Sequence, residues 1–335
     1  MITNLTFSQA KLTFQIQSNE EWFHSTLDFD FSPYINQTDI SKKIEINIHK
    51  IDSINDIDLP QVDEHSKQKD YIKFVDKDVY YFIYQSNVVC SYNHNSQKAV
   101  FLYIDKEACY EKLFLFIHSR LGEALDLQGI HRVHGLGVHY NNRAAIFLGI
   151  SGTGKSTLAF DLLKSKEKIT FFGEDICLVD NECKIHPFKM RWATYNALPD
   201  FPQQDKRVFL RQAAKEKNVV SPASSMLKWQ NDSRPINIIV ELKRTLKDKP
   251  WVKKLNKFEI FFLLLRDCGF GIGLPQVIEF FMLGTFSDYL LKPKIFFKRA
   301  VKCFQLTKQV QGRQLFLCGD GEKNVDKVLE IFSML

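Results

Sequence analysis

The stretch Gly149-Ile150-Ser151-Gly152-Thr153-Gly154-Lys155-Ser156-Thr157 decides how this chain is organised. It fits the pattern G-x-x-x-x-G-K-[ST], known as Walker A. The apolar run at 144–148 predicts a buried strand before it, and 158–164 predicts the opening of a helix after it. A strand, a glycine-rich loop and a helix, in that order, form the context in which this pattern binds phosphate.

The residue types in this loop suit a nucleoside triphosphate with Mg²⁺. Glycines allow successive backbone N–H groups to point at one anion, and the helix that follows adds the positive end of its dipole. Lys155 is predicted to reach the β- and γ-phosphates, and the Ser156 hydroxyl to hold the metal ion. The predicted ATP-binding residues are Gly149, Ser151, Gly152, Thr153, Gly154, Lys155, Ser156 and Thr157.

An acidic pair, Glu174-Asp175, follows the loop at a distance of about 20 residues, between predicted strands at 169–172 and 176–179. If both segments end at one edge of a sheet, these carboxylates face the phosphates. We expect Asp175 to bind the metal together with Ser156 or to accept a proton from an attacking hydroxyl, and Glu174 to support metal or water. The alternative is a surface turn with two solvated carboxylates.

His134 lies upstream, in a segment that predicts a β-hairpin with its turn at Asn141-Asn142. The hairpin would return into the strand before the glycine loop and so place His134 near that loop. A packed or hydrogen-bonded ring without a catalytic role is the alternative. Together, the candidate catalytic residues are His134, Lys155, Glu174 and Asp175.

This combination resembles the catalytic domain of HPr kinase/phosphorylase and related serine kinases. The resemblance rests on His134-Gly135, the 149–157 loop and Glu174-Asp175 in that order, with further similarity at His186-Pro187-Phe188 and in the apolar run 234–242. It covers roughly residues 106–245. It implies the fold shared with phosphoenolpyruvate carboxykinases, a mixed, strongly curved sheet, and ATP-dependent phosphorylation of a hydroxyl, often a serine.

The chain also departs from that family. Two aspartates are usual where this chain has Glu174-Asp175. No segment matches the glycine-rich region associated with the phosphorylase reaction, so dephosphorylation by inorganic phosphate is not expected. The family's N-terminal domain is not recognisable in residues 1–105, and HPr itself is therefore not the expected acceptor.

Composition narrows the functional classes. The 335 residues are 45% apolar and carry a net charge of +6, which is too diffuse to indicate nucleic-acid binding. Seven cysteines without a C-x-x-C pair indicate reduced thiols and a cytoplasmic protein. No signal peptide or membrane span is expected. The 29 phenylalanines are dispersed, which favours core packing.

The sequence predicts an α/β protein with a β-rich N-terminal region at 1–105 and a kinase-like domain at 106–335. A polar insertion at about 200–232, with a helical patch near 208–214, is interpreted as a lid or an acceptor-binding arm, or as a solvated connection. The Gly-rich segment 263–276 is interpreted as a buried structural turn leading into a helix at 276–283, and its Arg266 is a candidate cation for a phosphoryl group. The basic tract 292–302 is interpreted as a surface face with an apolar stripe.

Three functional hypotheses remain open at this point. The leading one is a cytoplasmic Mg-ATP-dependent kinase whose acceptor is a serine of a protein or peptide, or a hydroxyl of a small sugar- or glycerol-type molecule. The second is a P-loop ATPase or GTPase that acts as a switch. The third is a regulatory nucleotide-binding protein without catalysis. Self-association is left open for all three.

Overall fold

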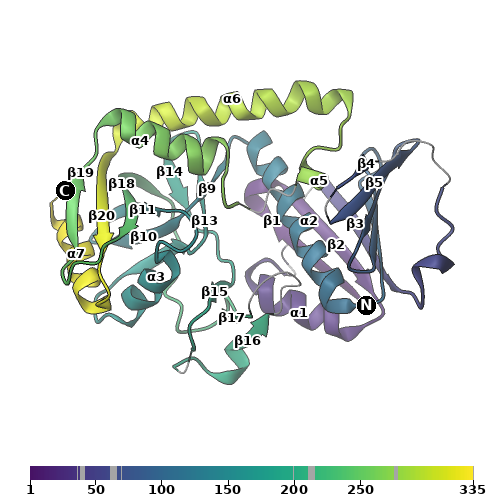
Figure 1. Ribbon diagram of the computed structural model, residues 1–335, viewed down its shortest axis with the longest axis horizontal. Helices are drawn as coiled ribbons and strands as arrows, with labels where there is room; N and C mark the ends of the chain where they lie inside the picture. The colour runs from purple at the N-terminus through teal and green to yellow at the C-terminus, as the bar shows by residue number, and fades with distance from the viewer. Residues whose placement is uncertain are drawn as a thin grey trace. The chain divides into compact units, whose positions relative to one another are not determined.

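The chain has a mixed α/β architecture with parallel and antiparallel strand pairs, as the sequence predicted (Figure 1). The computed structural model describes residues 1–35, 37, 42–60, 66–68, 70–198, 200–209, 216–274 and 278–334. Packing divides the chain into two units. Unit 1 comprises Met1–Ala124, Val208–Lys217 and Pro275–Asp288, and unit 2 comprises Leu125–Arg207, Asn218–Leu274 and Tyr289–Leu335. The helix that follows residue 105 therefore packs, as far as Ala124, with the β-rich N-terminal part.

Unit 1 is built on one sheet, which in the described part of the chain has eight strands in the order β1-β2-β3-β8-β7-β6-β5-β4. The strands are β1 (Ile2–Phe7), β2 (Leu12–Ser18), β3 (Lys42–Lys50), β4 (Ser66–Lys67), β5 (Tyr71–Asp76), β6 (Val79–Tyr84), β7 (Val88–Asn93) and β8 (Lys98–Tyr103). Strand β3 is parallel to both β2 and β8, and the other neighbours are antiparallel. The β-rich character expected of residues 1–105 is confirmed.

Helices α1 (Glu21–Phe31), α2 (Lys106–Leu127) and α5 (Ile278–Phe281) complete unit 1. Many phenylalanines serve the core here, as expected: Phe280 of α5 makes edge-to-face ring contacts with Phe82 and Phe116 at centroid distances of 4.9 Å and 5.1 Å. Such aromatic pairs add to the free energy of burial. The expected helix at 276–283 is present as the shorter α5, and residues 275–277 lie outside the described part.

Unit 2 contains a second mixed sheet, with nine strands among the described residues. Seven of them run in the order β12-β10-β11-β18-β14-β13-β9, and β20 pairs with both β18 and β19. The strands are β9 (His131–His134), β10 (Leu136–Tyr140), β11 (Arg143–Leu148), β12 (Thr170–Gly173), β13 (Ile176–Val179), β14 (Lys184–His186), β18 (Arg234–Arg244), β19 (Trp251–Lys254) and β20 (Gln311–Leu317). Strands β11 and β18 are parallel, as are β18 and β20.

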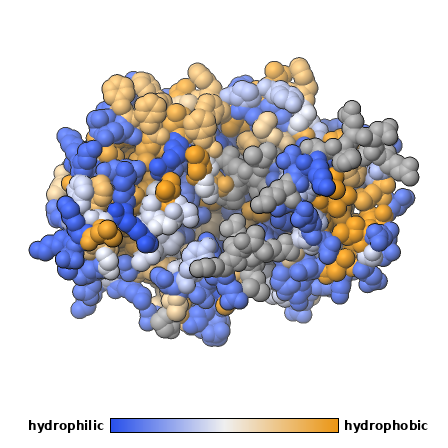
Figure 2. Space-filling model, in the orientation of Figure 1, coloured by the Kyte–Doolittle hydropathy of each residue, from blue (hydrophilic) through white to orange (hydrophobic). Residues whose placement is uncertain are grey.

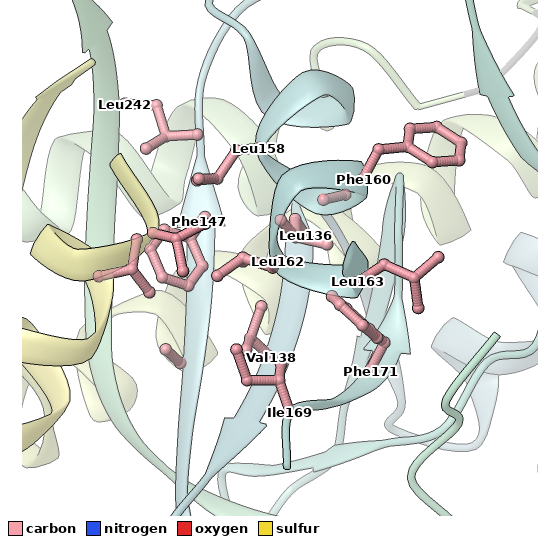
Figure 3. Close-up of a cluster of buried hydrophobic side chains, with 14 of the residues drawn as sticks. Leu136, Val138, Phe147, Leu158, Phe160, Leu162, Leu163, Ile169, Phe171 and Leu242 are labelled. Carbon is pink, nitrogen blue, oxygen red and sulfur yellow. The ribbon is translucent and has the colours of Figure 1, made fainter. Parts of the chain in front are cut away.

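Helices cover both faces of this sheet (Figure 1). They are α3 (Lys155–Lys164), α4 (Lys257–Leu264), α6 (Phe286–Gln309) and α7 (Gly321–Ser333). Side chains of β11 alternate between two hydrophobic clusters because successive strand residues point to opposite faces. Phe147 packs with Leu158 and Leu162 of α3 (Figure 3), whereas Ile146 packs in the cluster that contains Ile260 of α4 and Leu306 of α6. The β11–α3 connection is thereby fixed between two cores.

The predicted hairpin upstream of the glycine loop is confirmed. Strands β10 and β11 are antiparallel, and Asn141 and Asn142 both have positive φ, at 48° and 61°, which is the backbone of a two-residue hairpin turn. The strands expected at 169–172 and 176–179 are also present as β12 and β13, and the apolar run 234–242 lies in β18.

Two local expectations need correction. The helical patch expected from residue 208 is wrong at its start, because Val208 belongs to the strand β16 (Lys206–Phe209), whose β-branched and aromatic residues favour extended backbone. Residues 210–215 lie outside the described part. The region also contains β17 (Lys217–Val220), which pairs with β15 (Trp192–Thr194). The second correction concerns the expectation that the phenylalanines pack in the core. Several aromatic side chains of α4 and α6 are exposed.

Candidate phosphate-binding and catalytic site

The glycine-rich loop lies between the end of β11 at Leu148 and the start of α3 at Lys155. Gly152 and Gly154 have φ of 86° and 99°, a left-handed backbone that favours glycine. The Thr153 side chain donates a hydrogen bond to the Ile150 carbonyl at 2.8 Å, which closes the loop on itself. Because the first N–H groups of a helix have no partner within it, the loop and the start of α3 form a surface suited to an anion.

Lys155 is the first residue of α3, and its side chain is buried beneath the loop. Its ammonium group donates to the Gly149 carbonyl at 2.7 Å and to Nε2 of His134 at 3.0 Å. Burial lowers the pKa of Lys155, although the charges of Asp175 and Glu174 oppose that fall. The amine is therefore held at the base of the loop by neutral acceptors, which a phosphate could replace.

His134 ends β9 and lies directly opposite Ile176 of β13, so sheet pairing brings it next to Asp175. Its Nδ1 is 3.1 Å from the Asp175 carbonyl and 3.3 Å from the carboxylate oxygen Oδ1. With Lys155 donating to Nε2, the proton of a neutral ring belongs on Nδ1, where it is donated to Asp175. Burial lowers the pKa of His134; the Asp175 charge opposes this and the Lys155 charge adds to it, and the net pKa is below its ordinary value of 6.5, which favours the neutral ring near pH 7.

The two adjacent carboxylates lie in different surroundings. Glu174 is buried and accepts a hydrogen bond from the Ser156 hydroxyl at 2.5 Å, whereas the Asp175 side chain is 55% exposed and faces His134. The sequence paired Ser156 with Asp175 as metal ligands. In the structure Ser156 lies instead beside Glu174, because consecutive residues at a strand junction point in different directions.

These residues also fit a metal ion that is shared with a nucleotide. Within the described ranges, no group of three or more His, Cys, Asp or Glu side chains could hold a metal by itself. Mg²⁺ bound with a nucleotide needs only one or two protein oxygens, since phosphates and water supply the rest of its octahedron. Ser156 and Glu174 provide two adjacent oxygen ligands of the required kind.

The Gly-rich segment after α4 lies at this site, although its candidate cation Arg266 is paired with the neighbouring Asp267. It begins with a π-helical turn, Leu265–Gly269, in which the buried Asp267 is held by two hydrogen bonds from Arg266, at 2.8 Å and 2.7 Å. The Asp267 charge counteracts the lowering of the pKa of both Lys155 and His134. Gly273 has φ of 90°, and a Cβ there would lie 2.6 Å from the His134 ring. The segment therefore covers His134.

Arg244 is a second residue that sequence reasoning missed. It is the last residue of β18, and a Cβ on Gly154 would lie 3.9 Å from its guanidinium Nε. Arg244 is exposed, as are Ser151 and Thr157 of the loop. A strand parallel to β11 ends beside the loop that follows β11, because parallel neighbours finish at the same edge of a sheet. Only the strand order of the sheet reveals that Arg244 lies beside the glycine loop.

No protein-family model matches this chain, and no curated protein shows significant similarity to it. None of the helices in the described part of the chain is both long and apolar enough to span a bilayer. All seven cysteines are free thiols, and six of them are buried.

Proposed function

We propose that this protein is a Mg-ATP-dependent kinase that transfers the γ-phosphate to a hydroxyl, in the manner of the HPr-kinase-like serine kinases. One observation carries the proposal. Lys155 of the glycine loop lies 3.0 Å from His134, which lies 3.3 Å from the Asp175 carboxylate, and Ser156 lies 2.5 Å from Glu174. A loop that only closed a turn would need neither a buried lysine nor two carboxylates in different settings beside it.

The loop N–H groups and Lys155 would hold the phosphates. On nucleotide binding the Lys155 amine exchanges its contact with the Gly149 carbonyl for contacts with phosphate oxygens. Negatively charged phosphate oxygens stabilise the buried ammonium group far better than a neutral carbonyl does. Arg244 lies where it adds a second cation. Ser156 and Glu174 would hold Mg²⁺, which when bound supplies positive charge to the phosphate oxygens as negative charge develops on them.

Asp175 would accept the proton of the attacking hydroxyl. Its side chain is half exposed and therefore accessible to an acceptor, while the Nδ1–H of His134 orients it. His134 itself is a positioning residue, since its Nε2 is taken by Lys155 and its lowered pKa leaves it a weak base. As oxygen attacks the γ-phosphorus, the bond to the β-phosphate oxygen breaks, ADP leaves and the hydroxyl proton passes to Asp175.

The accessible position of Asp175 favours a serine of a protein or peptide as acceptor. A carboxylate that is 55% exposed can be reached by a side chain presented from a partner's surface. A small sugar- or glycerol-type alcohol is the second acceptor class, and it would need the acceptor to be enclosed after binding, because water would otherwise compete for the phosphoryl group.

Mass spectrometry with ATP labelled at the γ-position tests the proposal. The purified protein is incubated with Mg-ATP and a cleared extract, beside Lys155→Ala, Asp175→Asn and, as a matched surface control on α3, Lys164→Ala. We expect a labelled peptide or metabolite that disappears with the first two variants and persists with the third. Label that appears only as free phosphate would identify an ATPase, and the absence of any turnover with intact ATP binding would identify a regulatory module. Either result would refute the kinase.

A further inference from the structure

Helix α6 has large apolar side chains on its exposed side, and its buried side holds basic side chains beside the core residues Ile295, Cys303 and Leu306. From residue 289 onwards, its exposed large apolar side chains include Leu290, Phe297, Val301 and Phe304, and Phe297 is 69% exposed. These positions are separated by seven, four and three residues, so they form one stripe along the helix. The opposite side buries Lys292, Arg299 and Lys302. A helix that covers a sheet normally presents polar residues to solvent, so the exposed apolar stripe and the buried cations are the unusual features of α6.

Specific bonds hold α6 in this orientation. The buried Arg299 forms an ion pair with Asp126, in which its Nε lies 3.0 Å from Oδ1. The Lys302 ammonium donates to the Asn181 carbonyl and to Gln305, both at 2.7 Å. Rotating the helix to hide its aromatic side would break these buried polar contacts, at a large energetic cost. The exposed stripe is therefore a fixed feature of the surface.

Helix α4 extends the stripe into a wider surface. Phe258 and Phe262 of α4 are 77% and 64% exposed. The two helices are joined at their ends, where the Lys257 ammonium donates to carbonyls at the C-terminus of α6, and Phe261 of α4 contacts the ring of Phe304. Figure 2 shows hydrophobic side chains gathered over α4 and α6. We call this surface the aromatic face, and it consists of Phe258, Phe262, Phe270, Leu290, Phe296, Phe297, Val301 and Phe304.

The charges that α6 adds beside the aromatic face are positive, and the carboxylate of Glu259 on α4 is paired with Lys253. Lys294, Lys298 and Lys308 of α6 are exposed, and residues 289–309 contain no Asp or Glu. The Lys308 ammonium lies 4.3 Å from the ring centroid of Phe304. Interfaces between proteins are enriched in aromatic residues but depleted in lysine. Exposed phenylalanine and leucine together with lysine are instead typical of helices that lie in the headgroup region of an anionic membrane.

We propose that the aromatic face docks the protein on an anionic phospholipid bilayer. Helices α4 and α6 would lie in the plane of the surface, with phenylalanine rings inserted at the boundary of headgroups and acyl chains and with lysines beside lipid phosphates. This is a peripheral contact and requires no membrane-spanning segment. The contact can be tested apart from the proposed phosphoryl transfer, because the residues substituted below lie outside the glycine loop, the carboxylates beside it and the Gly-rich segment 263–276.

Sedimentation with lipid vesicles tests this proposal without any nucleotide. We expect binding to phosphatidylcholine vesicles that contain phosphatidylserine, and at least about tenfold weaker binding to pure phosphatidylcholine, since each lysine near an anionic surface adds about 1 kcal/mol, or roughly fivefold. The pair Phe297→Ser with Phe304→Ser and the pair Lys294→Ala with Lys298→Ala should each weaken binding to anionic vesicles by about tenfold or more. Leu246→Ser, at a fully exposed residue outside the face, should leave binding unchanged.

Three results would overturn the proposal. The first is no binding of the wild-type protein to anionic vesicles. The second is binding that neither pair of substitutions weakens, although thermal unfolding shows both variants to be folded. The third is self-association of the wild-type protein in analytical ultracentrifugation that the phenylalanine pair abolishes, which would assign the aromatic face to a second copy of the chain.

Discussion

Glu174→Gln and Asp175→Asn should have separable effects, although the two residues are adjacent in sequence. The structure places the buried Glu174 carboxylate against the Ser156 hydroxyl, and it places the half-exposed Asp175 carboxylate beside His134. If Ser156 and Glu174 hold the metal, Glu174→Gln removes a negative charge from a metal ligand. Asp175→Asn removes the proton acceptor and leaves the metal ligands in place.

Burial sets the relative size of the two effects on metal binding. Two unit charges 4 Å apart interact by about 1 kcal/mol in water and by about 4 kcal/mol at an effective dielectric constant of 20. The buried Glu174 is close to the condition with a dielectric constant of 20, and the half-exposed Asp175 is closer to the condition in water. We therefore expect Glu174→Gln to raise the Mg²⁺ concentration needed for half-maximal nucleotide binding by about 100-fold, or about 2.7 kcal/mol. Asp175→Asn should raise it by about threefold or less.

A titration with Mg²⁺ at fixed concentration of a fluorescent ATP analogue measures this difference directly. Phosphoryl transfer to the identified acceptor should show the opposite order, with Asp175→Asn slowing the reaction by about 10²–10⁴-fold at saturating Mg²⁺. Lys164→Ala, on the exposed part of α3, provides a control that should change neither quantity. Equal shifts in the Mg²⁺ requirement for both variants, or a shift with Asp175→Asn alone, would refute the assignment of Glu174 to the metal and Asp175 to the acceptor.

Two further predictions test the surroundings of the site. Gly273→Ala should displace the His134 ring, because a Cβ at this backbone φ of 90° would approach the ring to 2.6 Å. The substitution should lower both the midpoint of thermal unfolding and the nucleotide affinity. Gly319→Ala is the control and should lower neither, because a Cβ there meets nothing within 4 Å. Asp126→Asn should destabilise the protein by about 3 kcal/mol in urea unfolding at neutral pH. Burial raises the pKa of Asp126, but hydrogen bonds from His131 and Arg299 outweigh burial, and the net pKa is lowered. The stabilisation by the Asp126 carboxylate is therefore fully present above the ordinary pKa of 3.8. It is lost as the pH falls through the lowered pKa of the folded protein. A difference between wild type and variant that persists undiminished in strong acid would contradict this linkage.

Local pattern was sufficient to predict the elements that carry the site. The apolar run before Gly149 and the glycine-rich loop after it specify a strand, a loop and a helix, because buried strands and left-handed glycines are encoded by adjacent residues. The Asn141-Asn142 turn and the strands on either side of Glu174-Asp175 are encoded in the same way. These features correspond to β10, β11, α3, β12 and β13.

The local sequence pattern is a poor guide where the burial of a side chain depends on a partner far away in the sequence. The basic tract 292–302 predicts a surface face with an apolar stripe, and its stripe and some of its lysines are exposed. Arg299 is nevertheless buried against Asp126, from which 172 other residues separate it in the chain. Phenylalanine content predicts core packing, and it does so in unit 1. In α4 and α6 the same residue type is exposed, because the buried polar bonds of α6 determine which side of the helix faces the sheet.

The sequence by itself determined that a glycine loop with Lys155 and Ser156 starts a helix and that His134 and two carboxylates lie close by in the chain. Only the tertiary structure decided which carboxylate meets Ser156, that Arg244 lies beside Gly154, and that the segment around Asp267 and Gly273 covers His134. The physical reason is that φ, ψ and side-chain periodicity are local properties. The direction of a side chain at a strand junction, and the neighbour it meets there, depend instead on sheet order and on packing between residues far apart in sequence.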